Sequence, residues 1–165
     1  MAAGNDTTRY SITAGMLALL EHPAQLAALR DDLSLVPGAV EEMLRWGSET
    51  IHYRRTAVVD ATLGGTAITA GDKVLIWFLS GDFDERRFPR PFDFDIRRAP
   101  NDHLAFGLKS PHKCLGEHLA RLEMRVFFEE LLPALADIRV SGPVARLRSN
   151  FISGIKRLPV SVVWT

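Results

Sequence analysis

The chain has 165 residues, of which 47% are hydrophobic, so it is long enough to bury one compact core. Basic and acidic residues each total 20, and the resulting net charge of zero provides no basic field for a nucleic-acid partner. The longest apolar stretches, Ile12 to Leu20 and Val74 to Leu79, are too short to span a bilayer, and the chain starts without a secretory signal. We therefore expect a cytoplasmic protein without membrane spans.

Hydrophobic periodicity predicts three helices in the first third of the chain. The first begins near the chain start and ends at Pro23, and a second, short helix should cover Gln25 to Asp32. A third helix should end near Gly47. The residues at helical spacing are Ile12, Met16, Leu19 and Leu20 in the first helix and Val40 and Leu44 in the third.

The middle of the chain changes to β character. His52 to Leu79 shows strand-like alternation around a Gly64-Gly65 turn and predicts a small antiparallel sheet. Asp82 to Pro100 has no usable period and is expected to form an ordered meander. Two extended runs between Leu147 and Trp164, separated around Ser153-Gly154, predict a hairpin.

A long helix is predicted directly after Cys114, with Pro133 near its end. We expect one apolar stripe of this helix to face the core. The stripe consists of Leu115, Leu119, Leu122 and Val126.

Cys114 is the single cysteine of the chain, which excludes an internal disulfide and a multi-thiolate metal site. It is therefore a buried structural residue, a nucleophile or the lone axial ligand of a cofactor. Its place before a helix favours a thiolate, because amide donors and the helix dipole stabilise the negative charge. A thiol enzyme that pairs Cys114 with His112 remains an alternative, although residues two apart in a loop with a proline seldom bring an imidazole onto the sulfur.

The string from Phe106 through Cys114 to Arg121 resembles the cysteine-ligand loop of the cytochrome P-450 superfamily, in a bacterial version that is one residue longer. The resemblance implies a mainly α fold with small antiparallel β-sheets and haem b (iron protoporphyrin IX) as cofactor, with Cys114 as the ligand of the iron. The other residues that it assigns to cofactor binding are Phe106, Gly107, His112, Gly116, Ala120 and Arg55. Within this set, His112 and Arg55 would bind the haem propionates.

A second match is Glu42-Met43-Leu44-Arg45, which resembles the buried Glu-x-x-Arg pair of the family and implies a structural role for Glu42 and Arg45. In isolation this spacing would indicate an exposed ion pair of about 0.3–0.5 kcal/mol. The third partner of the pair normally comes from the meander, where this chain has Asp93 before Phe94-Asp95. His103 or Arg90 is expected to take its place.

A third match is Ala3-Gly4-Asn5-Asp6-Thr7-Thr8, which resembles the distal helix that passes over the haem. It implies that Asp6 and Thr7 serve proton delivery and oxygen binding, whereas the same residues would otherwise be read as helix caps. The C-terminal segment around Phe151 and Ile152 resembles that of bacterial members that oxidise sterol side chains and branched lipids. Its tip is expected to contact substrate or to pack in the core.

Taken as a whole, residues 1–165 resemble the C-terminal, haem-binding part of a longer monooxygenase as a single partial domain. The implied reaction is oxygen activation at Cys-ligated haem and hydroxylation of a hydrophobic substrate such as a steroid or branched lipid. Electrons would come from NAD(P)H through a reductase and a ferredoxin-type partner, with Lys109 and Lys113 as docking residues. The alternative is a truncated, non-catalytic haem-binding fragment or a remnant without function.

Overall fold

The computed structural model describes residues 2–107 and 111–165, with side chains from Asp6 onward. Its helices are α1 (Ala2–Glu21), α2 (Pro23–Asp31), the 3-10 turn η1 (Leu33–Leu35), α3 (Val36–Gly47), α4 (Phe78–Asp82) and α5 (Glu117–Ala134). Its strands are β1 (His52–Thr56), β2 (Ala61–Leu63), β3 (Thr66–Ile68), β4 (Lys73–Trp77), β5 (Leu135–Val140), β6 (Ala145–Arg146), β7 (Ile155–Arg157) and β8 (Val160–Trp164). The expected fold class, mainly α with small antiparallel sheets, is confirmed.

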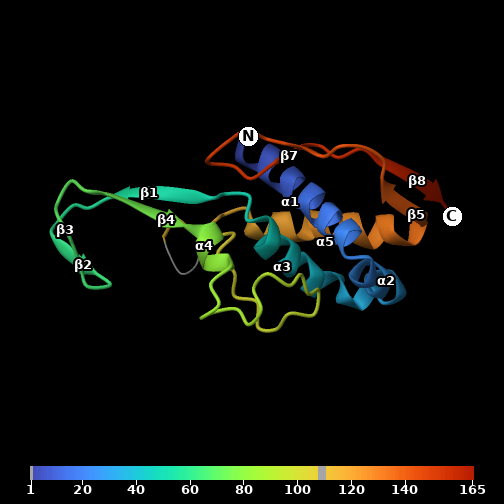
Figure 1. Cartoon of the computed structure of the whole chain (residues 1–165), viewed down its shortest axis with the longest axis horizontal. Coiled ribbons are helices and arrows are strands. Elements are labelled where there is room, and N and C mark those ends of the chain that lie inside the picture. Colours follow the sequence, from blue (N-terminus) through green and yellow to red (C-terminus); the bar gives the residue numbers. More distant parts are fainter. Residues whose placement is uncertain (1, 108–110) are drawn as a thin grey trace.

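The helices α1, α3 and α5 pack against one another and form the body of the molecule (Figure 1). All three helices predicted in the first third of the chain are present. α1 ends at Glu21 because Pro23 starts α2, and α3 ends where Ser48 adopts a left-handed backbone with φ of 40°. The core between the helices is formed by Leu19, Leu29, Val36, Ala39, Val40, Met43, Leu44, Met124, Phe128 and Leu132.

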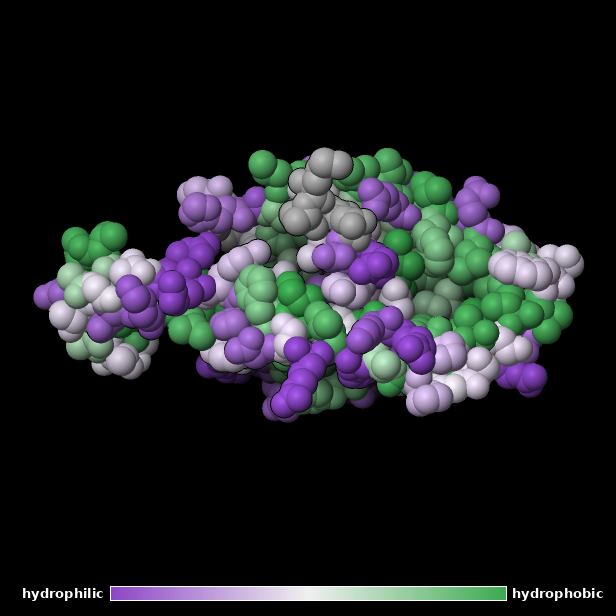
Figure 2. Space-filling model, turned by 90° about the horizontal axis from the view of Figure 1, so that it is seen from above, coloured by the Kyte–Doolittle hydropathy of each residue, from purple (hydrophilic) through white to green (hydrophobic). Residues whose placement is uncertain are grey.

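The stripe of α5 that was predicted to face the core is instead exposed. Leu115 is fully exposed, and Leu119 is 58% exposed. A second stripe of α5, offset from the first around the helix axis, contains Met124, Phe128 and Leu132 and is completely buried. Both stripes have helical spacing, so periodicity could not decide which one meets α1 and α3. Apolar surface is also visible over the helical body on the face drawn in Figure 2.

Strands β1 and β4 form an antiparallel ribbon that projects from the helical body and carries the β2–β3 hairpin at its far end (Figure 1). Gly64 and Gly65 form the predicted turn between β2 and β3, and both have positive φ, a conformation that glycine adopts without strain. The antiparallel prediction is confirmed, but the strands make two separate two-stranded sheets.

The predicted hairpin between Leu147 and Trp164 is wrong in its strands. β6 pairs with β7, whereas residues 147–152 carry only an isolated bridge between Thr50 and Ile152. The last run, β8, pairs with β5, a strand that sequence reasoning missed because it follows α5 without a turn signal. The last strand of the chain therefore pairs with β5 at the end of α5, and not with the segment that precedes it.

The meander at residues 82–100 is ordered without strands, as predicted. It is held by buried apolar side chains, of which Phe88, Phe94 and Ile96 are at most 3% exposed. None of the helices in the described ranges combines the length and the apolar character that a membrane crossing requires.

Candidate functional site

Cys114 lies in a folded loop between the meander and α5, with its side chain exposed. Its backbone N–H donates to the carbonyl of Phe106 at 2.9 Å, and the Gly107 N–H donates to the carbonyl of Leu104 at 2.8 Å. Gly107 has φ of 71°, a left-handed conformation that favours glycine. Gly116 is the N-cap of α5, so the loop leads from Cys114 directly into the helix. Three other residues of the matched string, Leu108, Lys109 and Ser110, lie outside the described residues.

The surroundings of Cys114 suit a large planar cofactor with a thiolate ligand. Leu115 and Leu119 present exposed apolar side chains next to the thiol and one turn into α5. Thiolate sulfur is an established axial ligand of haem iron, and an apolar macrocycle lying on such side chains would remove them from water. Within the described parts of the chain, no group of three or more His, Cys, Asp or Glu side chains could hold a metal ion by protein ligands alone. The exposed thiol and the exposed apolar side chains that follow it in the chain are the residues that fit a haem.

A network of charged side chains connects the Cys114 loop and α5 to α3. Arg121 of α5 donates to Glu41 of α3 at 2.8 Å and to Glu117 at 2.8 Å, and its guanidinium lies 4.6 Å from the centre of the Phe106 ring. His103 contacts the same Glu41 carboxylate at 3.0 Å through Nε2. Burial alone would raise the pKa of Glu41, but the hydrogen bonds from His103 and Arg121 outweigh it and lower the pKa to about 2. The network fixes Phe106 and α5 relative to α3.

The Glu42–Arg45 pair is fully buried, as the family resemblance implied. Two parallel hydrogen bonds of 2.8 Å join the guanidinium of Arg45 to the two carboxylate oxygens of Glu42. Arg45 also donates to the backbone carbonyls of Asp82 and Pro91, which ties α3 to α4 and the meander. This bidentate, buried arrangement is very different from an exposed helical ion pair.

The third partner of this pair is Arg98, and the expectation of His103 or Arg90 is wrong. Arg98 donates to Glu42 at 3.1 Å and is only 9% exposed. His103 instead contacts the Glu41 carboxylate, and Arg90 forms an ion pair with Asp93. In the sequence, Arg98 could have been identified only as the arginine three residues after Asp95. The meander folds back and brings this position to Glu42 of α3.

The two residues assigned to catalysis lie in the second turn of α1. Asp6 is exposed and forms an ion pair with Arg9 at 3.0 Å. Thr7 is partly buried, and its backbone carbonyl accepts a hydrogen bond from the Ser11 hydroxyl at 3.0 Å. The side chains of Ala3, Gly4 and Asn5, which belong to the same motif, lie outside the described residues.

The two residues assigned to the propionates are both exposed. Arg55 lies on β1, with its guanidinium 5.9 Å from the centre of the Tyr53 ring, and His112 lies in the loop before Cys114. Asp60, five residues after Arg55, accepts a hydrogen bond from the backbone N–H of Ala70. Ala120 is partly buried in the first turn of α5, where its N–H donates to Gly116.

Two further carboxyl groups that sequence reasoning missed are buried beyond α3. Burial raises the pKa of Glu49 to about 8 and that of Asp82 to about 6. Asp82 accepts hydrogen bonds from the Ser48 hydroxyl and the Leu104 N–H, whereas Oε1 of Glu49 has no partner within the described part of the chain. Nothing in the sequence marks either residue, because acidic side chains are normally solvated.

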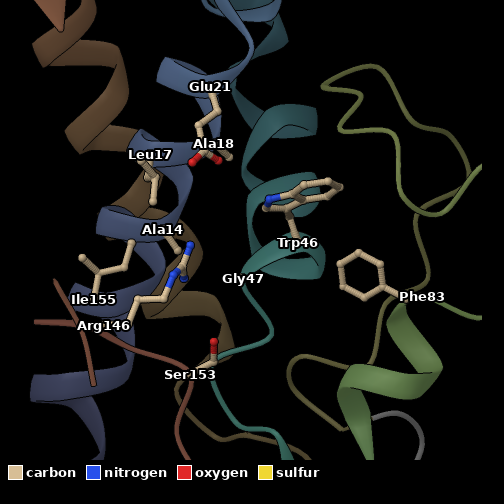
Figure 3. A pocket seen from close by; sticks show the side chains of 10 residues that line it. All are labelled: Ala14, Leu17, Ala18, Glu21, Trp46, Gly47, Phe83, Arg146, Ser153 and Ile155. Atoms are coloured by element: carbon tan, nitrogen blue, oxygen red, sulfur yellow. The ribbon is translucent and has the colours of Figure 1, made fainter. Parts of the chain in front are cut away.

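A hollow of about 260 Å³ lies between α1, the end of α3 and the C-terminal segment (Figure 3). Glu21 and Arg146 are its charged lining residues, and Trp46 and Phe83 form its aromatic wall (Figure 3). None of the residues assigned to haem binding lines it. The candidate haem site is therefore the exposed surface at Cys114, and the hollow is a separate feature.

Comparison with known proteins identifies the family. The cytochrome P450 family model matches residues 1–135. Methyl-branched lipid omega-hydroxylase of Mycobacterium tuberculosis is 48% identical over 162 residues, which are 98% of this chain and 38% of that protein. Steroid C26-monooxygenase of Mycolicibacterium smegmatis is 43% identical over 162 residues, which are 97% of this chain and 40% of that protein.

Solved structures agree. The crystal structure of P450BioI in complex with hexadec-9Z-enoic acid ligated acyl carrier protein has a TM-score of 0.94 at 35% identity, covering 98% of this chain and 42% of that chain. The present chain thus spans about two fifths of the length of these proteins. It belongs to the cytochrome P450 family, the haem monooxygenases that the loop around Cys114 resembles.

Proposed function

We propose that the chain is the C-terminal, haem-binding portion of a longer monooxygenase, in which Cys114 is the axial ligand of haem b. The observation that carries the proposal is an exposed thiol in a loop held by the Phe106 carbonyl, next to the exposed apolar side chains of Leu115 and Leu119. When bound, the haem supplies reductive activation of dioxygen and insertion of one oxygen atom into a carbon–hydrogen bond. The chain supplies the ligand, the supporting surface and the proton-handling side chains.

The residues around Cys114 would position the cofactor. His112 and Arg55 would bind its propionates, since both are exposed and can donate hydrogen bonds to carboxylates. Phe106 would shield the sulfur, and Gly107 and Gly116 would let the macrocycle approach the backbone closely. The Arg121 guanidinium over Phe106 supports this role, because it fixes the ring from the side of α3.

On α1, Asp6 and Thr7 would hold water and protons at the oxygen-binding face of the cofactor. Asp6 is exposed and can exchange protons with solvent, while its ion pair with Arg9 orients the carboxylate. Thr7 is one residue further into the helix and partly buried. This combination of a solvent-facing acid and an adjacent hydroxyl suits delivery of protons from water to a shielded position.

The substrate proposed for the complete protein is a hydrophobic molecule of the steroid or branched-lipid class, as the names of two relatives indicate. An aromatic group of this chain would form part of its binding wall. Tyr53 and Phe151 meet edge-on with ring centres 5.8 Å apart, and Trp77 stacks on His52 at 4.7 Å. Tyr53, Trp77 and Phe151 are each at least 42% exposed, so this apolar surface is available to a ligand.

Electrons for the reaction would come from NAD(P)H through a reductase and a ferredoxin-type protein. Lys113 lies one residue before the proposed ligand, is 47% exposed and forms an ion pair with Glu117. An acidic partner would compete with Glu117 for this lysine, which precedes Cys114 in the chain. The second proposed docking residue, Lys109, lies outside the described residues.

The test is the absorption spectrum of the haem-loaded chain, reduced and bound to carbon monoxide. A Soret band at the position typical of thiolate ligation is expected, and Cys114→Ser should abolish it. His118→Gln, which changes an exposed side chain near the loop, is the matched control and should retain it. A histidine-type spectrum, or a thiolate spectrum that survives Cys114→Ser, would contradict the ligand assignment. Haem binding without turnover by the reconstituted full-length protein would favour a non-catalytic haem-binding fragment.

A further inference from the structure

His103 is a buried histidine to which the proposed reaction assigns no task. It follows the meander and is 5% exposed. The backbone N–H of Ala105 donates to its Nδ1 at 3.2 Å, and its Nε2 lies 3.0 Å from a carboxylate oxygen of Glu41 in α3. A backbone N–H can only donate, so Nδ1 is an acceptor and carries no proton. The ring proton is therefore on Nε2, and it is donated to Glu41.

Through this bond His103 holds the backbone on which Cys114 rests. Ala105 directly precedes Phe106, whose backbone carbonyl accepts the Cys114 N–H at 2.9 Å. Nδ1 of His103 thus fixes the chain one residue before the carbonyl that receives Cys114. The short covalent link between the two positions means that a displaced Ala105 would displace the Phe106 carbonyl as well.

Glu41 also holds the Phe106 side chain, through Arg121 of α5. Nε of the guanidinium donates to one oxygen of Glu41 at 2.8 Å, and a terminal nitrogen donates to the other oxygen at 3.0 Å. The guanidinium lies 4.6 Å from the centre of the Phe106 ring, and the His103 ring lies 6.0 Å from it. Paired bonds of this kind fix geometry better than a single contact does. One carboxylate therefore orients two groups that contact Phe106.

We propose that Glu41 and His103 are positioning residues for the Cys114 ligand. Glu41 accepts the Nε2 proton of His103, so Nδ1 stays available to the Ala105 N–H, and the Phe106 carbonyl stays on the Cys114 N–H. The ligand loop is then folded before haem binds, which lowers the cost of ordering it around the cofactor. The proposal rests on the proposed function of Cys114 as iron ligand, but its hydrogen bonds belong to the chain without haem.

Cys114 provides a selective probe, because it is the single cysteine of the chain. Labelling with ¹⁵N-cysteine gives one backbone amide signal, and its hydrogen-exchange rate reports opening of the bond to the Phe106 carbonyl. ¹⁵N-methionine reports the amides of Met43 in α3 and Met124 in α5, both fully buried, as a reference for opening of the helical body. Neither label needs haem, so failure here is distinct from failure of the spectral test above.

Glu41→Gln changes the acceptor while keeping its shape. The amide nitrogen replaces one oxygen, so it faces an N–H of Arg121 or of His103 as a second donor. The Cys114 amide should then exchange about tenfold faster or more, while Met43 and Met124 keep their wild-type rates. Glu123→Gln, the same change at an exposed position on α5, should leave all three rates as in wild type.

Two variants of His103 separate the hydrogen bond from simple packing. His103→Leu fills the buried space but offers Ala105 no acceptor, whereas the side-chain oxygen of His103→Asn can take the place of Nδ1. If packing alone mattered, leucine would be the better tolerated of the two at a buried position. We expect the reverse, with Cys114 exchange about tenfold faster in His103→Leu and largely restored in His103→Asn.

Spectra of ¹⁵N-histidine, assigned by the signal lost in His103→Asn, should show the His103 proton on Nε2. A proton on Nδ1, or a wild-type Cys114 amide without protection from exchange, would overturn the proposal. The same holds if Glu41→Gln speeds Cys114 exchange no more than that of Met43 and Met124. Protection of Cys114 in His103→Leu that equals or exceeds that in His103→Asn would also overturn it.

Discussion

Two buried glutamates, Glu42 within α3 and Glu49 just beyond its end, have opposite surroundings. Glu42 in α3 is completely buried, and its oxygens accept from Arg45, Arg98 and Asn101. Glu49, seven residues later, is nearly as buried but has one oxygen without a partner in the described part of the chain and no cation beside it. Burial is common to both. The number and charge of the donors decide whether a buried carboxyl forms an ion pair or holds a proton.

The largest effect is expected from Arg45→Ala. This change leaves the Glu42 charge buried without its bidentate partner and removes the bonds to the Asp82 and Pro91 carbonyls. Loss of one member of a buried pair typically costs about 3–5 kcal/mol of unfolding free energy. Urea unfolding at pH 7 measures it, with exposed Arg139→Ala as the control. A loss below about 1 kcal/mol would mean that the two glutamates do not differ as described.

Glu49→Gln should remove a pH dependence of stability. The folded state holds the Glu49 proton up to about pH 8, whereas the unfolded chain releases it near 4.5, so the folded state binds more protons between these values. The free energy of unfolding of the wild type therefore falls as pH rises through this window, by on the order of 5 kcal/mol. Urea unfolding from pH 4.5 to 8.5 should show a flatter profile for Glu49→Gln. If the free energies of unfolding of wild type and Glu49→Gln changed with pH in parallel, Glu49 would not hold a proton in the folded state, and its contrast with Glu42 would be refuted.

Arg98→Ala should have a smaller effect than Arg45→Ala, about 1–3 kcal/mol. Glu42 keeps Arg45, so its charge is not left alone, but the carbonyls of Pro89, Arg90 and Asp93 lose their shared donor. Arg98→Lys should restore little, since an ammonium cannot reproduce the guanidinium fork. Thermal unfolding, together with hydrogen exchange of the meander amides, measures the loss. Equal losses for Arg98→Ala and Arg45→Ala would give the two arginines equal roles.

The smallest effect is expected from Asn101→Ala. The amide of Asn101 donates to Glu42 at 3.0 Å, but its own Oδ1 is buried and has no partner in the described part of the chain. Truncation removes one hydrogen bond and also one unsatisfied acceptor, so the net loss should stay within about 1 kcal/mol. Urea unfolding beside Arg98→Ala checks the order. A loss larger than that of Arg98→Ala would make the neutral donor more important than the cation.

The sequence predicted those features of the site that depend on residues close together in the chain. The Cys114 loop, the pairing of Glu42 with Arg45 and the three N-terminal helices could all be identified from short spacings. Arg98 could not, because it reaches Glu42 only after the meander folds back on α3. The stripe predicted on α5 is likewise wrong, because a second stripe has the same helical spacing, and only packing against α1 and α3 selects Phe128 and its neighbours over Leu119.

Glu49 illustrates a second limit. A glutamate near a helix end is ordinarily a solvated side chain, and no local pattern distinguishes one that is enclosed by three segments. Its environment depends on contacts far along the chain, such as the Ser153 N–H that donates to its backbone carbonyl. Long-range packing of this kind sets the proton affinity of a side chain, and the chain order alone does not contain it.

The exposed stripe of α5 has a practical consequence for purified protein. Fluorescent dyes that bind apolar surface are widely used to detect molten globules. Here the folded chain already exposes Leu115, Leu119, Leu122 and Val126, so dye fluorescence should be strong in the native state. A folded sample could then be discarded as misfolded. Near-UV circular dichroism, which reports fixed aromatic packing such as that of Trp46, Phe83 and Phe94, would distinguish the two states.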